Sequence, residues 1–420
     1  MKPKTQLEIS VFADWKGLPE STLLGNLLVS PSRGKESFSF EYIDSWLQSG
    51  YSQMIDPDLQ LFSGIYYPKE RKSNFGVFLD SCPDRWGRLL MQRREAILAR
   101  QEYRKPERLL ESDFLLGVYD EHRMGALRFK VDPNGPFVNN NKTMPTPPWA
   151  SLSELEYASL KFEEDESEDP DFSKWLSLLL APGSSLGGAR PKASVKDSKN
   201  NLWIAKFPSR HDEKDIGAWE MVVNQLALQS GINTPECKLQ KFNSKYHTYL
   251  SRRFDRININ QRIHFASAMT MLSHTDGEDS EGVSYLDLAE FIVRHSISVE
   301  KDLEELWRRI VFSICVKNTD DHLRNHGFLL AKNGWTLSPA YDINANEYGT
   351  NLSLNIDQSN DSLDIDVALN VSGYFRLSST KANAIRKKIM EVSRNWKKVA
   401  LRYKISKSEI ERMEPAFSNY

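Results

Sequence analysis

An ordered series of segments between residues 184 and 342 constrains this chain more than any other feature of its sequence. The series runs from a glycine loop to a strand lysine, a helical glutamate, an Asp-x4-Asn run, a hairpin and a final aspartate. Each segment is a weak signal when it is taken alone. Their order matches the parts that phosphoryl transfer to a hydroxyl requires. The sequence therefore predicts a β-rich lobe followed by a helix-rich lobe.

The glycine loop is the run Ser184-Ser185-Leu186-Gly187-Gly188-Ala189-Arg190-Pro191-Lys192, which precedes a strand-like segment at 193–196. Adjacent glycines allow backbone N–H groups to turn inward, where phosphate oxygens could accept from them. Gly-Gly pairs are also common in ordinary turns, so that alternative stays open at this point.

Lys206 ends a strand-like segment at 201–206, which would pair back onto 189–196 across the loop 197–200. Such a hairpin places Lys206 under the glycine loop. Glu220 follows in the helical segment 218–229. A strand lysine paired with a helix glutamate positions ATP phosphates in kinases. The alternative is two unrelated surface charges.

Asp320 and Asn325 lie in the polar run 318–325, directly behind an apolar helical segment at 310–316. Their spacing is that of a kinase catalytic loop, in which the aspartate accepts the proton of the substrate hydroxyl. The asparagine oxygen suits Mg²⁺, a hard cation that prefers oxygen ligands.

A hairpin is predicted after this run, because Asn333-Gly334 separates the stretches 326–332 and 335–337. A two-residue turn at Asn333-Gly334 would place Asn325 opposite Asp342. Two oxygen ligands would then converge, as a Mg²⁺ site requires. The alternative is that Asp342 caps a turn or a helix.

Composition excludes several classes of protein. The 420 residues are 40% apolar and 27% charged, and their net charge of -2 excludes a generally basic nucleic-acid coat. The longest apolar runs are too short to span a bilayer, and the first ten residues lack a signal-peptide core. Three cysteines form neither a disulfide framework nor a metal-ligand spacing. We therefore expect a cytoplasmic protein of several domains, without membrane contact.

Charge is uneven along the chain. Residues 151–180 carry nine acidic side chains against two lysines, which indicates a linker and then a solvated segment. Residues 381–407 carry ten basic side chains against one acid, and their apolar positions recur at helical spacing. We expect one amphipathic helix there, whose basic face either is simply solvated or contacts a phosphate backbone.

The residues of this series resemble the HipA family, the serine/threonine kinase toxins of bacterial toxin–antitoxin pairs. The resemblance covers most of the chain. Its segments are Pro83–Arg88, Met124–Phe129, Ser185–Lys192, Arg253–Arg256, Asn318–Asn325 and Ser338–Asp342. The N-terminal part offers no chemistry of its own, and its apolar content suggests a packing or partner-docking role.

The resemblance implies an α+β chain with a bilobal protein-kinase-like fold, made of a β-rich N-lobe, a helix-rich C-lobe and an extra N-terminal α/β subdomain. The implied ranges are 1–130 for the subdomain, 131–180 for a linker and acidic segment, 181–256 for the N-lobe and 257–420 for the C-lobe.

The resemblance also implies ATP, Mg²⁺, a protein substrate of the aminoacyl-tRNA synthetase class and a HipB-like helix-turn-helix antitoxin that binds DNA. Growth inhibition and persistence would be the outcome. Asp320 would be the catalytic base, Asn325 and Asp342 would bind Mg²⁺, and Glu220 would pair with Lys206. The implied ATP contacts are Ser185, Gly187, Gly188, Ala189, Lys206, Arg253, Phe254, His322 and Asp342. Ser185 would be the autophosphorylation site, with Ser184 as the second candidate.

Three alternatives remain open. A metal-dependent hydrolase or nuclease could use Asp320, Asp321, His322, His326 and Asp342. A catalytically idle protein could act as a DNA-bound corepressor with the antitoxin, although every catalytic position holds a suitable side chain. A related lobe could also phosphorylate a small molecule.

Overall fold

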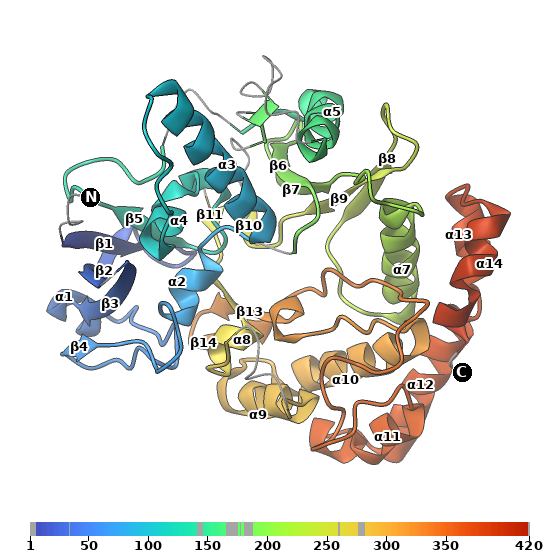
Figure 1. The fold of residues 1–420 in the computed structure, drawn as a ribbon. Coiled ribbons are helices and arrows are strands. Elements are labelled where there is room, and N and C mark those ends of the chain that lie inside the picture. The colour runs from blue at the N-terminus through green and yellow to red at the C-terminus, as the bar shows by residue number, and fades with distance from the viewer. Residues whose placement is uncertain are drawn as a thin grey trace. The chain divides into compact units, whose positions relative to one another are not determined.

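The computed structural model describes residues 6–32, 34–140, 146–164, 175–176, 178–179, 188–258, 261–275 and 282–418. Contacts divide the chain into two compact units (Figure 1). Unit 1 consists of Met1–Arg210 and Asp255–Ala266, and unit 2 consists of His211–Phe254 and Ser267–Tyr420.

Unit 1 begins with a five-stranded sheet in the order β4-β3-β2-β1-β5 (Figure 1). Its strands are antiparallel and comprise β1 (Leu7–Ala13), β2 (Thr22–Ser32), β3 (Lys35–Tyr42), β4 (Ile65–Tyr66) and β5 (Leu127–Lys130). Alternate residues of β3 are buried, which is the pattern of a strand with one face on a core. Phe78 of the helix Gly76–Asp80 packs against Phe40 and Phe129, at ring-centroid distances of 5.6 and 6.0 Å. This apolar layer is the core of the N-terminal part.

Four helices accompany the sheet. They are α1 (Asp44–Leu47), α2 (Gly76–Asp80), α3 (Arg85–Gln101) and α4 (Glu111–Gly117). Asp84 begins α3 as its N-cap, because its carboxylate accepts a hydrogen bond of 2.8 Å from the N–H of Gly87. Arg88 donates two hydrogen bonds of 2.8 Å to Glu111, and this bidentate pair holds α3 against α4.

The predicted hairpin around Lys206 is confirmed. Strands β6 (Lys192–Lys196) and β7 (Leu202–Lys206) are antiparallel, and Lys192 lies opposite Lys206. Asp197 closes the connecting loop by accepting hydrogen bonds from the backbone N–H groups of Lys199 and Asn201. Asp and Asn are typical of such turns because their side chains bond the backbone two or more residues on.

Helix α5 (Leu152–Glu163) corrects one expectation. The acidic count suggested a solvated segment from residue 151 onward. Leu155, Ala158 and Phe162 are nevertheless buried, at the spacing of one helix face. That expectation is wrong for α5, because a count of charges over a window does not register apolar periodicity. The predicted domain boundaries themselves stay a prediction.

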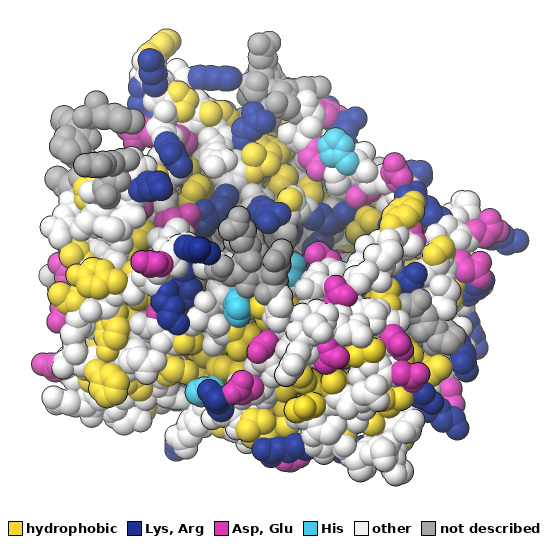
Figure 2. Space-filling view, turned by 60° about the horizontal axis from the view of Figure 1, so that its bottom comes forward, with side chains coloured by type: hydrophobic (Ala, Val, Ile, Leu, Met, Phe, Trp, Pro, Cys, Tyr) yellow, Lys and Arg dark blue, Asp and Glu magenta, His cyan; other side chains and the backbone are white. Residues whose placement is uncertain are grey.

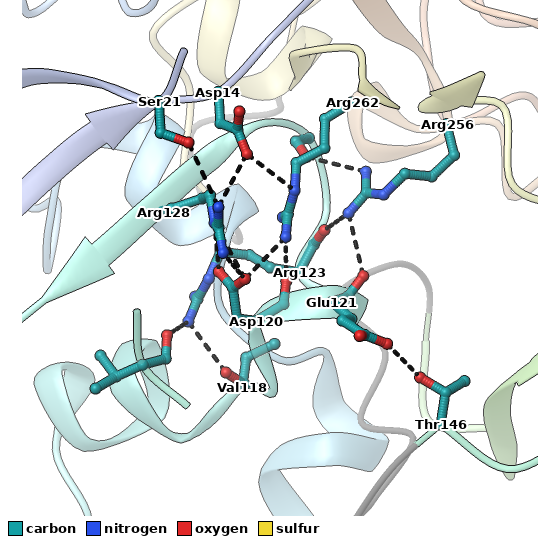
Figure 3. A network of polar contacts seen from close by, with 12 residues as sticks. Asp14, Ser21, Val118, Asp120, Glu121, Arg123, Arg128, Thr146, Arg256 and Arg262 are labelled. Atoms are coloured by element: carbon teal, nitrogen blue, oxygen red, sulfur yellow. Dashed lines mark hydrogen bonds and ion pairs between the residues drawn. The ribbon is translucent and has the colours of Figure 1, made fainter. Parts of the chain in front are cut away.

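Asp120 lies at the centre of a buried ionic network within unit 1 (Figure 3). Its Oδ2 accepts from Arg128 at 2.6 Å and from Arg262 at 2.9 Å, and Asp14 lies 3.1 Å from Arg128. Burial alone would raise the pKa of Asp120, but Arg262 and Arg128 outweigh it and lower that pKa below its usual value. The network joins β1 and β5 to β10 (Arg256–Asn258) and β11 (Gln261–Arg262).

Asp255 makes a second connection between the same parts of unit 1. Its side chain is 0% exposed, and Oδ2 accepts from the N–H of Gly125 at 2.9 Å and from Arg256 at 2.6 Å. Arg256 also donates to the carbonyls of Gly125 and Arg123, at 3.0 and 2.7 Å (Figure 3). The segment Met124–Phe129 and the segment Arg253–Arg256, which the sequence analysis singled out separately, therefore meet here.

Unit 2 is built around the helix α10 (Val299–Val316). Its strands are β8 (Cys237–Gln240), β9 (Thr248–Arg252), β13 (Gly327–Ala331) and β14 (Gly334–Leu337), and β12 (Phe265–Ser267) contains the boundary between the units. Its other helices are α7 (Ile216–Ser230), α8 (Ala268–Met271), α9 (Tyr285–His295), α11 (Ile365–Asn370), α12 (Ser379–Ser393), α13 (Trp396–Arg402) and α14 (Lys407–Met413). α10 packs against α7, α9, α11 and α12. Because it has neighbours on several sides, its second half is buried and mostly apolar.

The basic segment 381–407 is two helices, α12 and α13, rather than the single helix that was expected. The first ends at Ser393 and the second begins at Trp396, whose ring stacks on Phe417 at a centroid distance of 4.5 Å. Ile389 and Val399 are buried on either side of the break. The apolar spacing continues through the break, so periodicity alone could not reveal it.

The surface carries both signs of charge. Figure 2 shows Lys and Arg side chains beside Asp and Glu side chains at several places on the face drawn, in keeping with the net charge of -2. Within the described residues, no helix is both long enough and apolar enough to cross a membrane.

Replacing Asp255 by Asn should destabilise the fold. The variant keeps the shape of the side chain but leaves the buried guanidinium of Arg256 without its carboxylate, at a cost of about 3 kcal/mol. Urea denaturation would measure the change. The control is Arg294→Ala, which breaks an exposed pair with Glu290 and should cost less than about 1 kcal/mol. Equal, small losses in the two variants would contradict the role given to Asp255.

Candidate active site

The predicted catalytic run begins where α10 ends. Lys317 has φ 48 and closes the helix in the left-handed conformation, so the chain turns sharply. The run then continues to a single 3-10 turn, Leu323–Asn325, and into β13. Leu323 is buried under this turn. The run is thus held between a buried helix and a buried strand, and the side chains of its polar residues are placed by backbone turns.

Asp320 and Asn325 lie together, as their spacing predicted. The Nδ2 of Asn325 donates to the backbone carbonyl of Asp320 at 2.7 Å. The amide oxygen of Asn325 is therefore the atom left to act as an acceptor or a metal ligand. The Asp320 side chain is 83% exposed, and His322 Nε2 lies 3.9 Å from its Oδ1. An exposed carboxylate on a fixed turn is available to an incoming hydroxyl.

Asp342 lies on a segment that is bound to this run. Tyr341 donates its hydroxyl to the carbonyl of Arg324 at 2.7 Å, and the N–H of Asn344 donates to Asn318 Oδ1 at 3.2 Å. Asp342 itself has φ 55, a left-handed conformation that is uncommon for non-glycine residues but that Asp adopts more readily than most. Its Oδ1 accepts from Asn344 Nδ2 at 3.1 Å. The segments that carry Asn325 and Asp342 are thus side by side in unit 2.

The hairpin that precedes Asp342 is confirmed, but its predicted register is wrong. Ala331 pairs with Gly334, so Lys332 and Asn333 form the turn. Gly334 lies in the strand instead, where an added Cβ would meet the carbonyl of His295 at 2.8 Å. Gly334 thus packs closely against the end of α9, and the segments that carry Asn325 and Asp342 are joined by the hydrogen bond from Tyr341 to Arg324 instead of by strand pairing.

Asp321, the neighbour of Asp320, has a structural environment that the sequence did not reveal. It is 5% exposed; its Oδ2 accepts from Tyr285 at 2.6 Å and from Ser313 at 3.2 Å, and His326 Nε2 lies 3.0 Å from Oδ1. Burial alone would raise the pKa of Asp321, but His326 and the two hydroxyls outweigh it and lower that pKa. Asp321 and His326 are therefore occupied with each other, and neither faces solvent.

Arg253 and Phe254 begin the segment Arg253–Arg256, which resembles the hinge of the family and is called the hinge here. Arg253 is buried and Phe254 is half-buried. The ring of Phe254 lies 5.5 Å from that of Tyr341, centroid to centroid. Through Tyr341, the hinge side chain contacts the segment that carries Asp342.

The remaining predicted residues belong to other segments of the chain. Ser184, Ser185 and Gly187 lie outside the described residues. Gly188 and Ala189 are exposed, ahead of β6. Lys206 is half-buried at the end of β7 in unit 1, whereas Glu220 is buried on α7 in unit 2, so their pairing stays a prediction.

These residues fit a nucleotide and Mg²⁺ in their chemistry. Among the described residues, no three His, Cys, Asp or Glu side chains form a cluster that could hold a metal. Mg²⁺ needs no such cluster, since it is commonly held by one or two protein oxygens, waters and phosphate oxygens. Asn325 and Asp342 supply such oxygens. A Cβ added at Gly188 would meet no described atom within 4 Å, so packing does not require a glycine there and a ligand has room to approach.

Residues 184–400 match the family model of the HipA-like C-terminal domain, which is more than half of the chain. The chain belongs to the HipA family. A Haemophilus influenzae protein named "Putative kinase" is 29% identical to this HipA-family chain over 194 residues, which are 41% of the chain and 56% of that protein. The chain thus matches little more than half the length of this curated relative.

A solved structure supports the fold over nearly the whole chain. It is that of the Shewanella oneidensis MR-1 toxin–antitoxin system HipA, HipB and its operator DNA complex. The similarity has a TM-score of 0.66 at 18% identity and covers 98% of this chain and 95% of that chain. The Helicobacter pylori proinflammatory kinase CtkA gives a TM-score of 0.37 at 15% identity over 51% of this chain, which is too low to argue from. The predicted α+β, kinase-like fold is confirmed.

Replacement by Asn should change the free energy of unfolding much more at Asp321 than at Asp320. Asp321→Asn should lower the free energy of unfolding by about 2–4 kcal/mol, because Tyr285, Ser313 and His326 converge on that carboxylate. Asp320→Asn, at an exposed position, should change it by less than about 0.5 kcal/mol. Denaturant unfolding would measure both. If Asp321 instead served as a solvent-facing metal ligand, its replacement would leave the metal-free protein as stable as before.

Proposed function

We propose that this chain is an ATP- and Mg²⁺-dependent serine/threonine protein kinase, the toxin of a HipA-type toxin–antitoxin pair. The observation that carries the proposal is the pairing of an exposed Asp320 with a buried Asn325, whose amide bonds the Asp320 carbonyl at 2.7 Å. Membership of the HipA family and the name of the Haemophilus influenzae relative support it.

Each residue receives a role in this proposal. The carboxylate of Asp320 accepts the proton of the substrate hydroxyl, and its exposure leaves room for a protein chain to approach. Asn325 and Asp342 hold Mg²⁺, which neutralises charge on the ATP phosphates when it is bound. The residues that contact ATP are Ser185, Gly187, Gly188, Ala189, Lys206, Arg253, Phe254, His322 and Asp342, and Glu220 orients Lys206.

Autophosphorylation on Ser185, or on Ser184, makes the kinase self-limiting in this proposal. A phosphate adds about -1.5 to -2 of charge. In a loop that must hold the phosphates of ATP, that charge repels the substrate. The protein substrate belongs to the aminoacyl-tRNA synthetase class, so phosphorylation slows translation and growth and favours persistence. Cytoplasmic activity follows from that substrate.

Two of the five candidate metal ligands of the hydrolase alternative are buried in this structure. Asp321 and His326 are 5% and 2% exposed and contact each other and Tyr285. Only Asp320, His322 and Asp342 of the five candidate metal ligands remain accessible, and these are also the kinase residues. Phosphoryl transfer is therefore favoured over metal-dependent hydrolysis.

The direct test is transfer of label from ATP. The phosphatase-treated protein, incubated with Mg²⁺ and labelled ATP, should take up close to one phosphate per chain on Ser185 or Ser184, as mass spectrometry would show. Asp320→Asn should slow the transfer by at least about 100-fold, since a general base contributes roughly that much. Ser185→Ala and Ser184→Ala would assign the serine. An unphosphorylated protein that binds ATP but transfers nothing to itself or to added synthetases would contradict the proposal and favour a small-molecule kinase or an idle corepressor.

The partner in this proposal is a HipB-like helix-turn-helix antitoxin that binds DNA. The Shewanella HipA structure contains HipB and operator DNA. In this chain, helices α12 and α13 expose several cations, although Lys381 pairs with Glu304 and Lys397 with Glu414. Lys387 and Lys388 lie on the exposed face of α12, where they could meet phosphates, although Lys387 also lies 4.0 Å from Glu391.

Charge reversal on α12 tests the DNA contact. The double variant Lys387→Glu/Lys388→Glu should weaken binding of operator DNA by the toxin–antitoxin complex and reduce the salt dependence of that binding by about two counterions. Autophosphorylation should be unchanged. The matched control, Lys301→Glu/Lys332→Glu, alters net charge equally at two other exposed positions of unit 2. Equal affinities for the two variants in a gel-shift titration would show that α12 is merely solvated.

A further inference from the structure

The side chains of Asp84 and Lys192 form a buried ion pair within unit 1. Asp84 Oδ2 lies 2.9 Å from Lys192 Nζ, and the two side chains are 5% and 2% exposed. Asp84 belongs to the segment Pro83–Arg88, and Lys192 ends the glycine-loop segment. Two segments that are far apart in the sequence are therefore in contact, and the Lys192 side chain is buried in that contact.

Lys192 makes a second contact, which links the ion pair to Gly188. Its Nζ donates to the backbone carbonyl of Gly188 at 2.8 Å. This bond spans the stretch Gly188–Lys192, so it fixes the point at which the glycine loop joins β6. Asp84 is held in turn by the start of α3, since its other oxygen accepts from Gly87. The Gly188 carbonyl is thus connected to a helix end by two short contacts.

The pair also lies beside the lysine proposed to contact ATP. Lys192 and Lys206 are directly opposite in the β6–β7 ladder, and opposite residues point to the same face of a sheet. Like charges at opposed positions repel each other. Asp84 compensates the charge of Lys192 and so reduces the repulsion between Lys192 and Lys206.

Stability alone is a weak explanation for this arrangement. Burial raises the pKa of Asp84 to about 6, with Lys192 acting in the opposite direction, so the carboxylate is costly to ionise where it lies. Buried ion pairs are often no more stable than apolar side chains of similar size, whereas removing one partner is strongly destabilising. A pair that contributes little net stability is expected to be retained for the geometry that it imposes.

We propose that Asp84 and Lys192 are positioning residues that hold the Gly188 carbonyl and thereby fix the backbone of residues 188–192 for the binding of ATP. The inference rests on the proposed ATP-dependent function. It assigns to a residue of the N-terminal part a role in nucleotide binding, although that residue does not touch the nucleotide.

The decisive variant is the double change Asp84→Asn/Lys192→Met. Asn is a good N-cap and preserves the start of α3, and Met keeps most of the Lys192 stem without its charge. With both charges removed, neither partner is left buried and unpaired, so the chain should fold with a stability close to that of the parent. The Gly188 carbonyl nevertheless loses its donor.

ATP affinity should be measured in the full chain by calorimetry with Mg²⁺, in an Asp320→Asn background that prevents autophosphorylation. The double variant should bind ATP at least about 10-fold more weakly than its parent, although its unfolding midpoint is close to that of the parent. Each single variant should show a similar loss, because the two residues act as one unit. The control Glu111→Gln breaks a different ion pair of α3, at Arg88, and should change ATP affinity by less than about twofold.

The outcomes separate this inference from the proposed function. Parent-like ATP affinity in the folded double variant would overturn the positioning role and leave the kinase proposal intact. Absence of ATP binding by the parent chain would overturn both. If the double variant does not fold, the pair is structural and the inference is equally overturned. Hydrogen exchange adds a second readout, since backbone amides of 188–192 should exchange faster in the double variant while those of α4 do not change.

Discussion

Buried carboxylates in unit 1 require cationic partners, and those partners come from distant parts of the chain. Asp84 meets Lys192, and Asp120 meets Arg262, across separations of 108 and 142 residues. An unpaired charge in such a place would cost several kcal/mol, so each pair determines which segments lie together. The consequence is specific. The N-terminal sheet and helices are bonded to Gly188–Lys192 and to the segment after the hinge, which are the parts of unit 1 that the sequence associates with nucleotide binding.

Burial also distinguishes two adjacent residues of unit 2, Asp320 and Asp321. Asp320 is exposed, and its backbone carbonyl accepts a hydrogen bond from Asn325. Asp321 is buried, and its carboxylate contacts Tyr285, Ser313 and His326. One carboxylate therefore faces solvent, while the next holds the loop that carries both. Because the turn after α10 sends consecutive side chains in opposite directions, a polar run of this kind can serve structure and chemistry at once.

Local patterns in the sequence predicted local structure well. The hairpin around Lys206, the hairpin before Asp342 and the proximity of Asp320 to Asn325 all depend on residues close in the chain. The errors arose where distant packing decides. Gly334 lies in a strand and packs against His295, and Trp396, the first residue of α13, stacks on Phe417. The burial of Asp321 depends likewise on Tyr285, which no spacing rule connects to it.

The role of the N-terminal part could not be predicted for the same reason. Taken alone, its sequence shows apolar strands and no reactive motif, which indicates packing or docking. The structure shows that its polar groups bond to residues much later in the chain. Asp84 and Asp120 accept from Lys192 and Arg262, and the N–H of Gly125 donates to Asp255. Residues 184–400, which match the family model, contain the second member of each pair but not the first. A chain limited to that range would leave two cations and a carboxylate without these partners in the positions that border the glycine segment and the hinge. The N-terminal sheet and helices therefore complete the buried polar pairs of unit 1, although their own sequence shows no reactive motif.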